Sequence, residues 1–289
     1  DNLATVLESS GKSKEAEKLG LRALEVSRKN LGEDHLDEVW LLQKLGLRYQ
    51  GQGEYQEAEK AFLHGLKIRE SQLGPNHMDT AESLNLLGLL YKKQGRDEEA
   101  LSFFQRVLEI REKHLGEDHL EVAEFLNFLG LYYYMQERYD ESDPLYIRAL
   151  RIREDQLGPY HPDTALSLSN LGSLRNVQKK YEEAESLYAR ALIIREMKFG
   201  TDHSASMLTV KKLANLYELQ GKLGEAEPLY LRSLAFSEKK FGKDHPDTLP
   251  ALKDLASLYY DQGRYEEAES LYLRAVEINE ASGYSESVE

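Results

Sequence analysis

The chain of 289 residues carries 51 acidic against 37 basic side chains, which gives a formal net charge of −14. This balance argues against nucleic acid and against an anionic membrane surface, because both are bound through a basic protein surface. The chain has no cysteine, which excludes disulfides, thiolate metal sites and a cysteine nucleophile. No apolar run reaches the roughly 18 residues of a membrane span, and no basic-then-apolar signal segment opens the sequence. We therefore expect a soluble protein of the reducing cytoplasm, although a bacterial exterior also fits a chain without cysteine.

A five-residue phrase returns every 42 residues along the chain. It consists of a leucine or phenylalanine, a glycine, two variable residues and a histidine. Its six occurrences begin at Leu31, Leu73, Leu115, Leu157, Phe199 and Phe241. Self-similarity at a period of about 20–50 residues is typical of a solenoid, in which each repeat packs on its neighbours. The sequence therefore predicts one solenoid and not two globular domains.

Each row of 42 residues contains two apolar-periodic stretches joined by a turn. In one row, residues 81–93 place apolar side chains at three- and four-residue steps, which predicts a helix. Gly95 ends this helix, and a second helix is expected over about 97–113. The predicted boundaries are a partial repeat 1–31, full repeats at approximately 36–73, 78–115, 120–157, 162–199, 204–241 and 246–280, and a polar tail 281–289.

Two columns of the aligned rows predict where the helices touch. In the first helix, the residue after a repeated leucine is always small, and this column reads Ala4, Gly46, Gly88, Gly130, Gly172, Ala214 and Ala256. In the second helix a large aromatic residue recurs, and this column reads Phe62, Phe104, Tyr146, Tyr188, Tyr230 and Tyr272. Because dense packing matches large side chains with small ones, we expect the paired helices to approach closely at the small column.

The leucine-glycine or leucine-alanine pair, the tyrosine three residues later, and the alanine and aromatic of the second helix resemble the tetratricopeptide repeat. That motif usually runs about 34 residues. The 42-residue form looks like the repeats of kinesin light chains, and it is similar to those of nephrocystin-3 and many bacterial regulators. The resemblance implies an all-α fold, a right-handed superhelix of helical pairs (a TPR solenoid), and a protein-interaction scaffold or adaptor without a cofactor.

The six histidines of the phrase suggest a possible metal stack. They lie a full repeat apart, however, and each helix contact spans roughly 8–10 Å, far beyond the ~2 Å metal–nitrogen bonds of a zinc site. We therefore expect no metal site, and we expect each histidine to help fix the start of a helix. No nucleophile elbow, phosphate-binding glycine loop or His-Glu-x-x-His pair occurs, so we expect no catalytic residue and no enzyme activity.

Glutamate recurs at the start of every second helix, and arginine recurs seven residues later. The arginine column reads Arg22, Arg106, Arg148, Arg190, Arg232 and Arg274, with His64 as its one exception. A charged stripe for a partner is one interpretation of these columns. We favour the other, in which acids stabilise helix starts and the charges form weak ion pairs between neighbouring layers.

In the resembling family the first helices line the concave wall, and positions flanking the leucine-glycine pair face the groove. The candidate peptide-binding groove residues are Lys44, Asn85, Leu86, Asn127, Phe128, Tyr134, Asn170, Asn176, Lys211, Lys212, Lys253 and Tyr260. An asparagine amide can donate and accept together, and the resemblance implies that Asn85, Asn127 and Asn170 hold a peptide backbone in this way. Lys211, Lys212 and Lys253 favour an acidic segment in the ligand, although a solvated face explains them equally well.

These observations predict a scaffold that binds an extended or helical peptide, with Leu86, Phe128 and Tyr134 offering apolar contact. Two other functions stay open. One is a self-assembling array joined through open terminal helices, which the apolar residues Leu271, Leu273, Val276 and Ile278 suggest. The other is a regulatory or sensor region of a larger multidomain protein.

Overall fold

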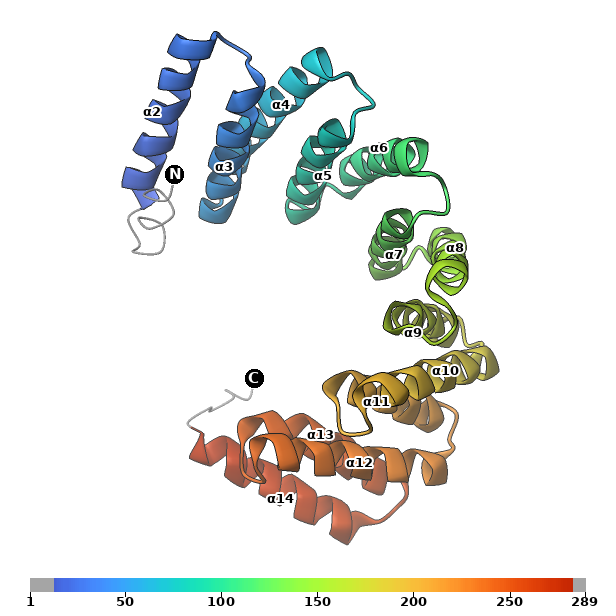
Figure 1. Ribbon diagram of the computed structural model, residues 1–289. Coiled ribbons are helices and arrows are strands. Elements are labelled where there is room, and N and C mark those ends of the chain that lie inside the picture. The colour runs from blue at the N-terminus through green and yellow to red at the C-terminus, as the bar shows by residue number, and fades with distance from the viewer. Residues whose placement is uncertain (1–12, 283–289) are drawn as a thin grey trace. The chain divides into compact units, whose positions relative to one another are not determined.

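The computed structural model describes residues 13–282 (Figure 1). In this part of the chain every regular element is a helix, which confirms the all-α prediction. The helices are α2 (Ser13–Leu31), α3 (Leu36–Gln52), α4 (Tyr55–Gln72), α5 (Met78–Lys93), α6 (Asp97–Leu115), α7 (Leu120–Met135), α8 (Tyr139–Leu157), α9 (Pro162–Val177), α10 (Tyr181–Phe199), α11 (Ser204–Leu219), α12 (Leu223–Phe241), the 3-10 helix η1 (Pro246–Thr248), α13 (Leu249–Asp261) and α14 (Tyr265–Ala281). Ala4 of the small column and residues 283–289 of the predicted tail lie outside the described residues.

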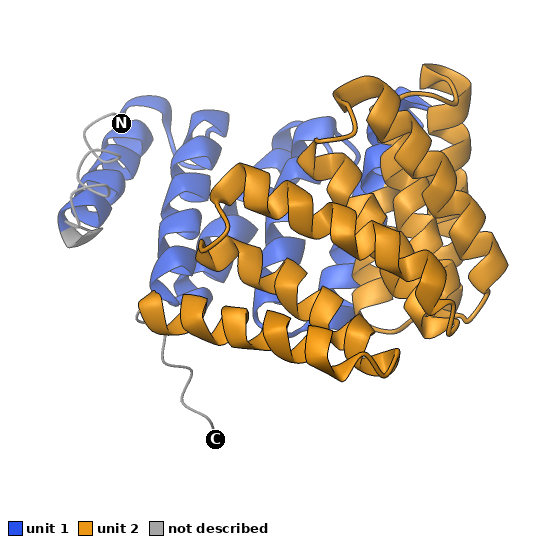
Figure 2. Ribbon diagram, turned by 90° about the horizontal axis from the view of Figure 1, so that it is seen from below, with its two compact units in different colours: residues 1–125 blue, residues 126–289 orange. Residues whose placement is uncertain are grey.

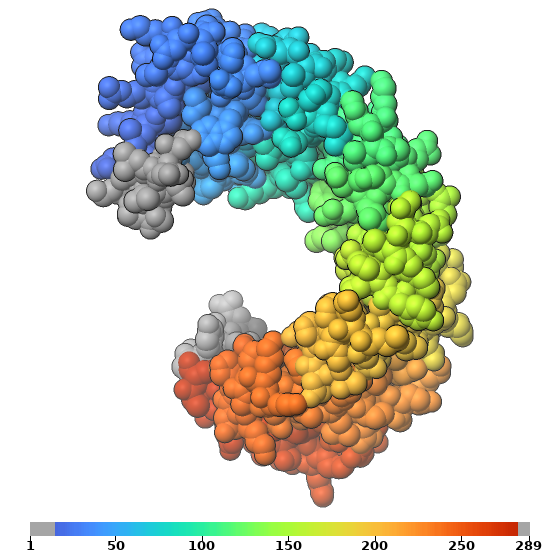
Figure 3. Space-filling model, in the orientation of Figure 1, coloured from blue at the N-terminus to red at the C-terminus, as the bar shows by residue number. Residues whose placement is uncertain are grey.

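The chain divides into two compact units, residues 1–125 and residues 126–289, which Figure 2 colours separately. In unit 1, α3 packs on α4, α4 on α5, and α5 on α6. In unit 2, each helix from α8 to α14 packs on the next helix along the chain, and side chains fill the space between paired helices (Figure 3). Packing between sequential neighbours is what a solenoid requires, since each layer is covered by the next. No helix among residues 13–282 is long and apolar enough to cross a membrane.

The repeated phrase ends one helix and begins the next, as predicted. At Gly116 the backbone has φ of +93°, and its N–H donates to the Glu112 carbonyl oxygen at 2.9 Å. Glycine adopts this positive φ without the steric penalty that a Cβ atom would bring. The histidine then caps the following helix, since Nδ1 of His161 accepts a hydrogen bond from the Asp163 backbone N–H at 3.2 Å. The same bond occurs at His35, His77, His119, His203 and His245.

The close helix approach at the small column is also confirmed. A Cβ atom added to Gly88 would lie 2.5 Å from Phe104 Cε1, and one added to Gly130 would lie 2.7 Å from a ring carbon of Tyr146. Both rings are buried. The aromatic ring of the second helix therefore fills the space that a side chain on the first helix would otherwise need.

A third column, which the sequence analysis missed, ties the second helices α4, α8 and α10 to the first helix of the next row. Nη1 of Arg153 in α8 donates to the Asp163 carbonyl oxygen at 3.0 Å and to Ser167 Oγ at 2.9 Å. Arg69 of α4 makes the equivalent two bonds at 2.6 and 3.0 Å. Because Arg153 is only 6% exposed, these neutral oxygens satisfy a buried cation. The signal was available, since arginine recurs at this position with the same 42-residue spacing.

Candidate functional site

The predicted groove residues all lie on first helices, but they belong to both units. Unit 1 contains Lys44 on α3, together with Asn85 and Leu86 on α5. Unit 2 contains the remaining nine, on α7, α9, α11 and α13. Each unit is described on its own below.

In unit 1 the predicted residues form no connected polar set. Lys44 is exposed, and its Nζ lies 5.8 Å from the centroid of the Trp40 ring, a cation–π contact. Asn85 and Leu86 are half-buried on α5. Trp40 itself is 44% exposed at the start of α3, so its ring offers an apolar surface beside the lysine.

In unit 2 two of the predicted asparagines bond to each other. Asn127 of α7 is 6% exposed, and its Nδ2 donates to Ser167 Oγ at 3.0 Å. Asn170 of α9 donates from Nδ2 to Asn127 Oδ1 at 3.3 Å. Asn127 therefore helps to hold α7 against α9, whereas Asn170 is half-buried and its carbonyl oxygen has no partner among the described residues.

The lysines of α11 have different partners. Nζ of Lys212 donates to Ser173 Oγ of α9 at 2.7 Å. Lys211 forms an ion pair with Asp254 of α13, with 2.6 Å between Nζ and Oδ2. Lys253 is exposed, and it has no ion pair within the described part of the chain.

These contacts link four consecutive first helices of unit 2 through their side chains. We call the face that they form the first-helix wall; it comprises Asn127, Asn170, Ser173, Lys211, Lys212 and Asp254. The wall is polar and carries both hydrogen-bond donors and hydrogen-bond acceptors.

The predicted aromatic residues of unit 2 each lie beside another aromatic ring. Phe128 stacks on Tyr132, and Tyr134 lies beside Tyr139, with centroid separations of 6.4 and 5.7 Å. Burial raises the pKa of Tyr134. Tyr260 is 59% exposed, and its ring centroid lies 5.4 Å from that of Tyr265.

Asn176 has a carbonyl oxygen that is buried and accepts no hydrogen bond from the described residues. Ser173 was not predicted, although it lies one helical turn from Asn170. Its column supplied a signal, because leucine at Leu47, Leu89 and Leu131 gives way to Ser173 and Asn215 in later rows. The leucines of this column are not core residues, since Leu47 and Leu131 are 44% and 45% exposed, so the change to serine and asparagine turns an apolar surface position into a polar one.

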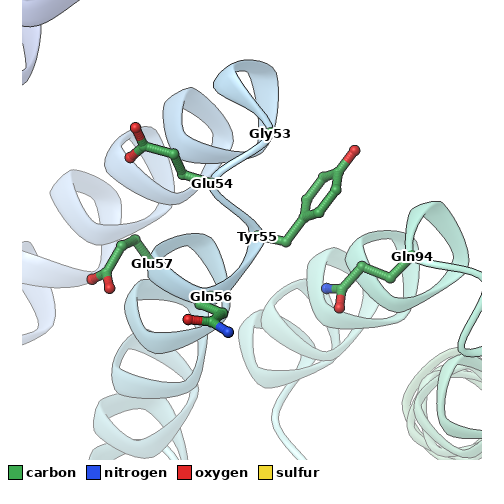
Figure 4. A pocket seen from close by; sticks show the side chains of 6 residues that line it. All are labelled: Gly53, Glu54, Tyr55, Gln56, Glu57 and Gln94. Carbon is green, nitrogen blue, oxygen red and sulfur yellow. The ribbon is translucent and has the colours of Figure 1, made fainter.

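A surface hollow of about 520 Å³ lies in unit 1, lined by Gly53, Glu54, Tyr55, Gln56, Glu57 and Gln94 (Figure 4). The side chains of Glu54 and Glu57 point away from Gln94, so the polar groups do not converge (Figure 4). Glu57 is engaged by Lys60, with 2.6 Å between Nζ and Oε1. Residues 13–282 also contain no cluster of three or more potential metal ligands.

Sequential helical pairs, a 42-residue period and a polar face on the first helices define a helical-hairpin repeat protein. The sequence model of the tetratricopeptide repeat matches residues 1–71, 49–113, 121–197, 167–239 and 204–281. The chain belongs to the tetratricopeptide repeat family, which confirms the resemblance. A comparison with curated proteins returned no match.

Solved structures with the same fold include BtubC (BKLC) from P. vanneervenii, at 20% identity and a TM-score of 0.65, covering 82% of this chain and 93% of that one. Kinesin-light-chain-type TPR-like repeats from Podosopora anserina have 23% identity and a TM-score of 0.64, covering 72% and 99%. A signal transduction ATPase of Pyrococcus horikoshii with a tetratricopeptide repeat sensor has 16% identity and a TM-score of 0.69, covering 98% and 42%. At these identities the likeness is one of fold.

Proposed function

We propose that the chain is a protein-interaction scaffold that captures a peptide segment of a partner on the first-helix wall. Proteins with tetratricopeptide repeats generally act as interaction scaffolds, and the fold carries no expectation of catalysis. The peptide mode, a kinesin-light-chain-like adaptor role and a cytoplasmic location are our inferences for this chain.

The observation that carries the proposal is the contrast between two adjacent columns of unit 2. The packing column is always leucine, at Leu129, Leu171, Leu213 and Leu255. The neighbouring column, one residue toward the amino end, varies completely in chemistry and reads Phe128, Asn170, Lys212 and Asp254. A column that only packed or capped helices would keep one chemistry, whereas a surface that recognises one heterogeneous segment needs several.

The wall and the predicted aromatic residues of unit 2 offer specific groups to such a segment. The free carbonyl oxygen of Asn170 can accept a hydrogen bond from a backbone N–H of an extended peptide. Phe128, Tyr134 and the exposed ring of Tyr260 offer apolar surface to its side chains. A single peptide held in this way is expected to bind with a dissociation constant of about 1 μM, equivalent to about −8 kcal/mol.

The test begins with selection of random amidated dodecapeptides on the whole chain, followed by fluorescence anisotropy with the enriched peptides. Asn170→Ala should weaken binding about five- to tenfold, which corresponds to the loss of one hydrogen bond. The melting temperature should fall only slightly, because Asn170 is half-buried and the variant loses a single long hydrogen bond, its donation to Asn127 Oδ1 at 3.3 Å. Asn30→Ala is the matched control, since Asn30 is an exposed asparagine on α2 in unit 1. Equal affinities for both variants, or no enriched peptide, would contradict the proposal.

Asn127 is unsuited to this test because its amide lies inside the structure. Replacement by alanine would leave Ser167 Oγ without its Asn127 donor, and we expect a loss of about 1–3 kcal/mol in stability. A loss of peptide binding in the Asn127→Ala variant could therefore come from the loss of stability and would not show that Asn127 contacts the peptide.

Self-association is the second candidate, and one observation favours it. Tyr272 and Val276 of α14 are 41% and 50% exposed, whereas the equivalent Tyr230 and Leu234 of α12 are buried. Leu273 is also exposed, but Ile278 is buried, so the prediction of an open apolar face was wrong at that residue. Sedimentation velocity at several concentrations tests this function, and a single concentration-independent monomer would refute it.

A further inference from the structure

Lys212 differs in its electrostatic surroundings from Lys211 and Lys253, the other two lysines predicted for the groove in unit 2. Lys211 is paired with Asp254, with 2.6 Å between Nζ and Oδ2, and Lys253 is exposed to water. Lys212 is half-buried, and the partner of its Nζ is the neutral Oγ of Ser173 at 2.7 Å. Of the three cations, Lys212 alone is both partly removed from water and without an anion among the described residues.

The elements packed around Lys212 supply no counter-charge. From α10, the centroid of the Tyr188 ring lies 5.7 Å from Nζ, and Arg195 adds a second buried cation whose recorded hydrogen bonds go to neutral oxygens. α11 itself carries one carboxylate, that of Glu218, and this group accepts a hydrogen bond from the Tyr230 hydroxyl. From α13, the carboxylate of the first-helix wall is that of Asp254, which is already paired with Lys211. The site is therefore locally positive within a chain of net charge −14.

The geometry leaves donors of Lys212 available. The Ser173 hydroxyl donates to the Ser169 carbonyl oxygen at 2.9 Å, so its lone pairs remain to accept from Lys212. An ammonium group has three N–H donors, and Ser173 takes one of them. Burial, and then the charge of Arg195, lower the pKa of Lys212 to about 8.

We propose that the ammonium group of Lys212 receives one carboxylate of the bound peptide, from an aspartate or glutamate side chain, and that Lys211 and Lys253 do not. This inference rests on the proposed function, because it names the ligand chemistry of the same wall. A carboxylate at this point forms a charge-assisted hydrogen bond with the free donors and supplies the missing counter-charge. At Lys211 the same carboxylate would have to displace Asp254, and at Lys253 water already solvates the charge.

The proposal implies that binding is linked to a proton. A bound carboxylate favours the ammonium form, so the pKa of Lys212 is higher in the complex than in the free protein. The affinity is then fully present below the free-state pKa of about 8 and falls as the pH rises above it. For a free-state midpoint of about 8 that rises by about one pH unit in the complex, the affinity should fall about fivefold between pH 7 and pH 9.

The probe is the pentapeptide acetyl-Ala-Ala-Glu-Ala-Ala-amide, with its glutamine counterpart as the neutral control. Protein labelled with carbon-13 and nitrogen-15 in lysine reports each side-chain amine by NMR, and Lys212→Arg assigns the Lys212 signal. With the glutamate peptide, the titration midpoint of Lys212 should rise by at least about one pH unit, while that of Lys253 should not move. The glutamine peptide should move neither midpoint.

Two variants complete the test. Lys212→Gln should remove the preference for the glutamate peptide, which we expect to be about tenfold at pH 7, whereas the matched control Lys253→Gln should retain it. An unchanged Lys212 midpoint with the glutamate peptide would overturn the proposal. Equal binding of the two peptides would also overturn it, yet would leave peptide capture standing. Selection of dodecapeptides tests that capture separately, so the two failures are distinguishable.

Discussion

Replacement by alanine should change the free energy of unfolding in opposite directions at two buried glycines of unit 1. Gly65 lies inside α4 and Gly88 lies inside α5, and both are buried. Replacement of an interior helical glycine by alanine favours the helix by about 1 kcal/mol, because alanine loses less conformational entropy on folding. This gain is common to both sites, so any difference between them measures packing.

The packing differs sharply. A Cβ atom at Gly65 would lie 3.5 Å from Val39 Cγ1, which is an ordinary contact. At Gly88 it would lie 2.5 Å from Phe104 Cε1, and that ring is buried with its edge toward Phe125, at 6.3 Å between centroids. The ring cannot move away without compressing its neighbour, and overpacking of this kind costs about 1–3 kcal/mol. We expect Gly65→Ala to stabilise by about 1 kcal/mol and Gly88→Ala to destabilise by about 0–2 kcal/mol.

Denaturation in urea, followed by circular dichroism and by hydrogen exchange at the amides of α5 and α6, measures both effects. Exchange is informative because a repeat array can open locally before it unfolds as a whole. In the double variant with Phe104→Leu, the penalty of Gly88→Ala should shrink, since leucine leaves room for the added methyl group. If Gly88→Ala raised the urea midpoint as much as Gly65→Ala does, the close helix contact would be wrong.

Three further outcomes follow from the contacts described above. His161→Ala removes the acceptor for the Asp163 N–H and should lower stability by about 1 kcal/mol, read from the thermal melt; no change would mean that the cap contributes nothing. His64→Arg places a second guanidinium beside Arg28 and should lower the melting temperature; an unchanged melt would refute this. Burial raises the pKa of Tyr91 from about 10 to about 12, so the stability it contributes is present below pH 10 and lost as the pH rises toward 12; Tyr91→Phe should flatten this alkaline loss in urea titrations.

The fold could be predicted because its determinants recur in every row. The period places each leucine, glycine and aromatic in register with its equivalents, and the histidine caps lie at fixed distances from the glycines that end the preceding helices. Local rules for helix ends and for matching large with small side chains then suffice. A single row would have carried much less information than six.

The polar contacts of the wall could not be predicted in the same way. Asn127 and Asn170 lie 43 residues apart, and so do Lys211 and Asp254. Such pairs form across neighbouring rows, and whether two side chains meet depends on rotamers and on the offset between layers, which the period does not specify. The sequence therefore identified the variable positions but not which of them satisfy one another.

His64, the one exception in the arginine column, shows how side-chain pairs between neighbouring rows constrain the sequence. In later rows, Arg106, Arg190, Arg232 and Arg274 pair with the glutamate 36 residues earlier, at 2.5–2.7 Å. In the row that contains His64, that glutamate position is occupied by Arg28, so an arginine at position 64 would face another cation. The substitution is compensated on both sides, since Glu38 accepts from Arg28 Nε at 3.0 Å and Asp34 lies 2.6 Å from His64 Nε2.

A departure from the repeat therefore has one of two physical explanations. Where the neighbouring row changes with it, as at Arg28 and His64, the charges remain balanced within the protein and the departure concerns stability. Where no side chain in the neighbouring row changes with it, as at Lys212, the charge stays unbalanced within the protein and can be neutralised by a bound molecule. Charge compensation between rows thus separates variation that maintains the solenoid from variation that is available for recognition.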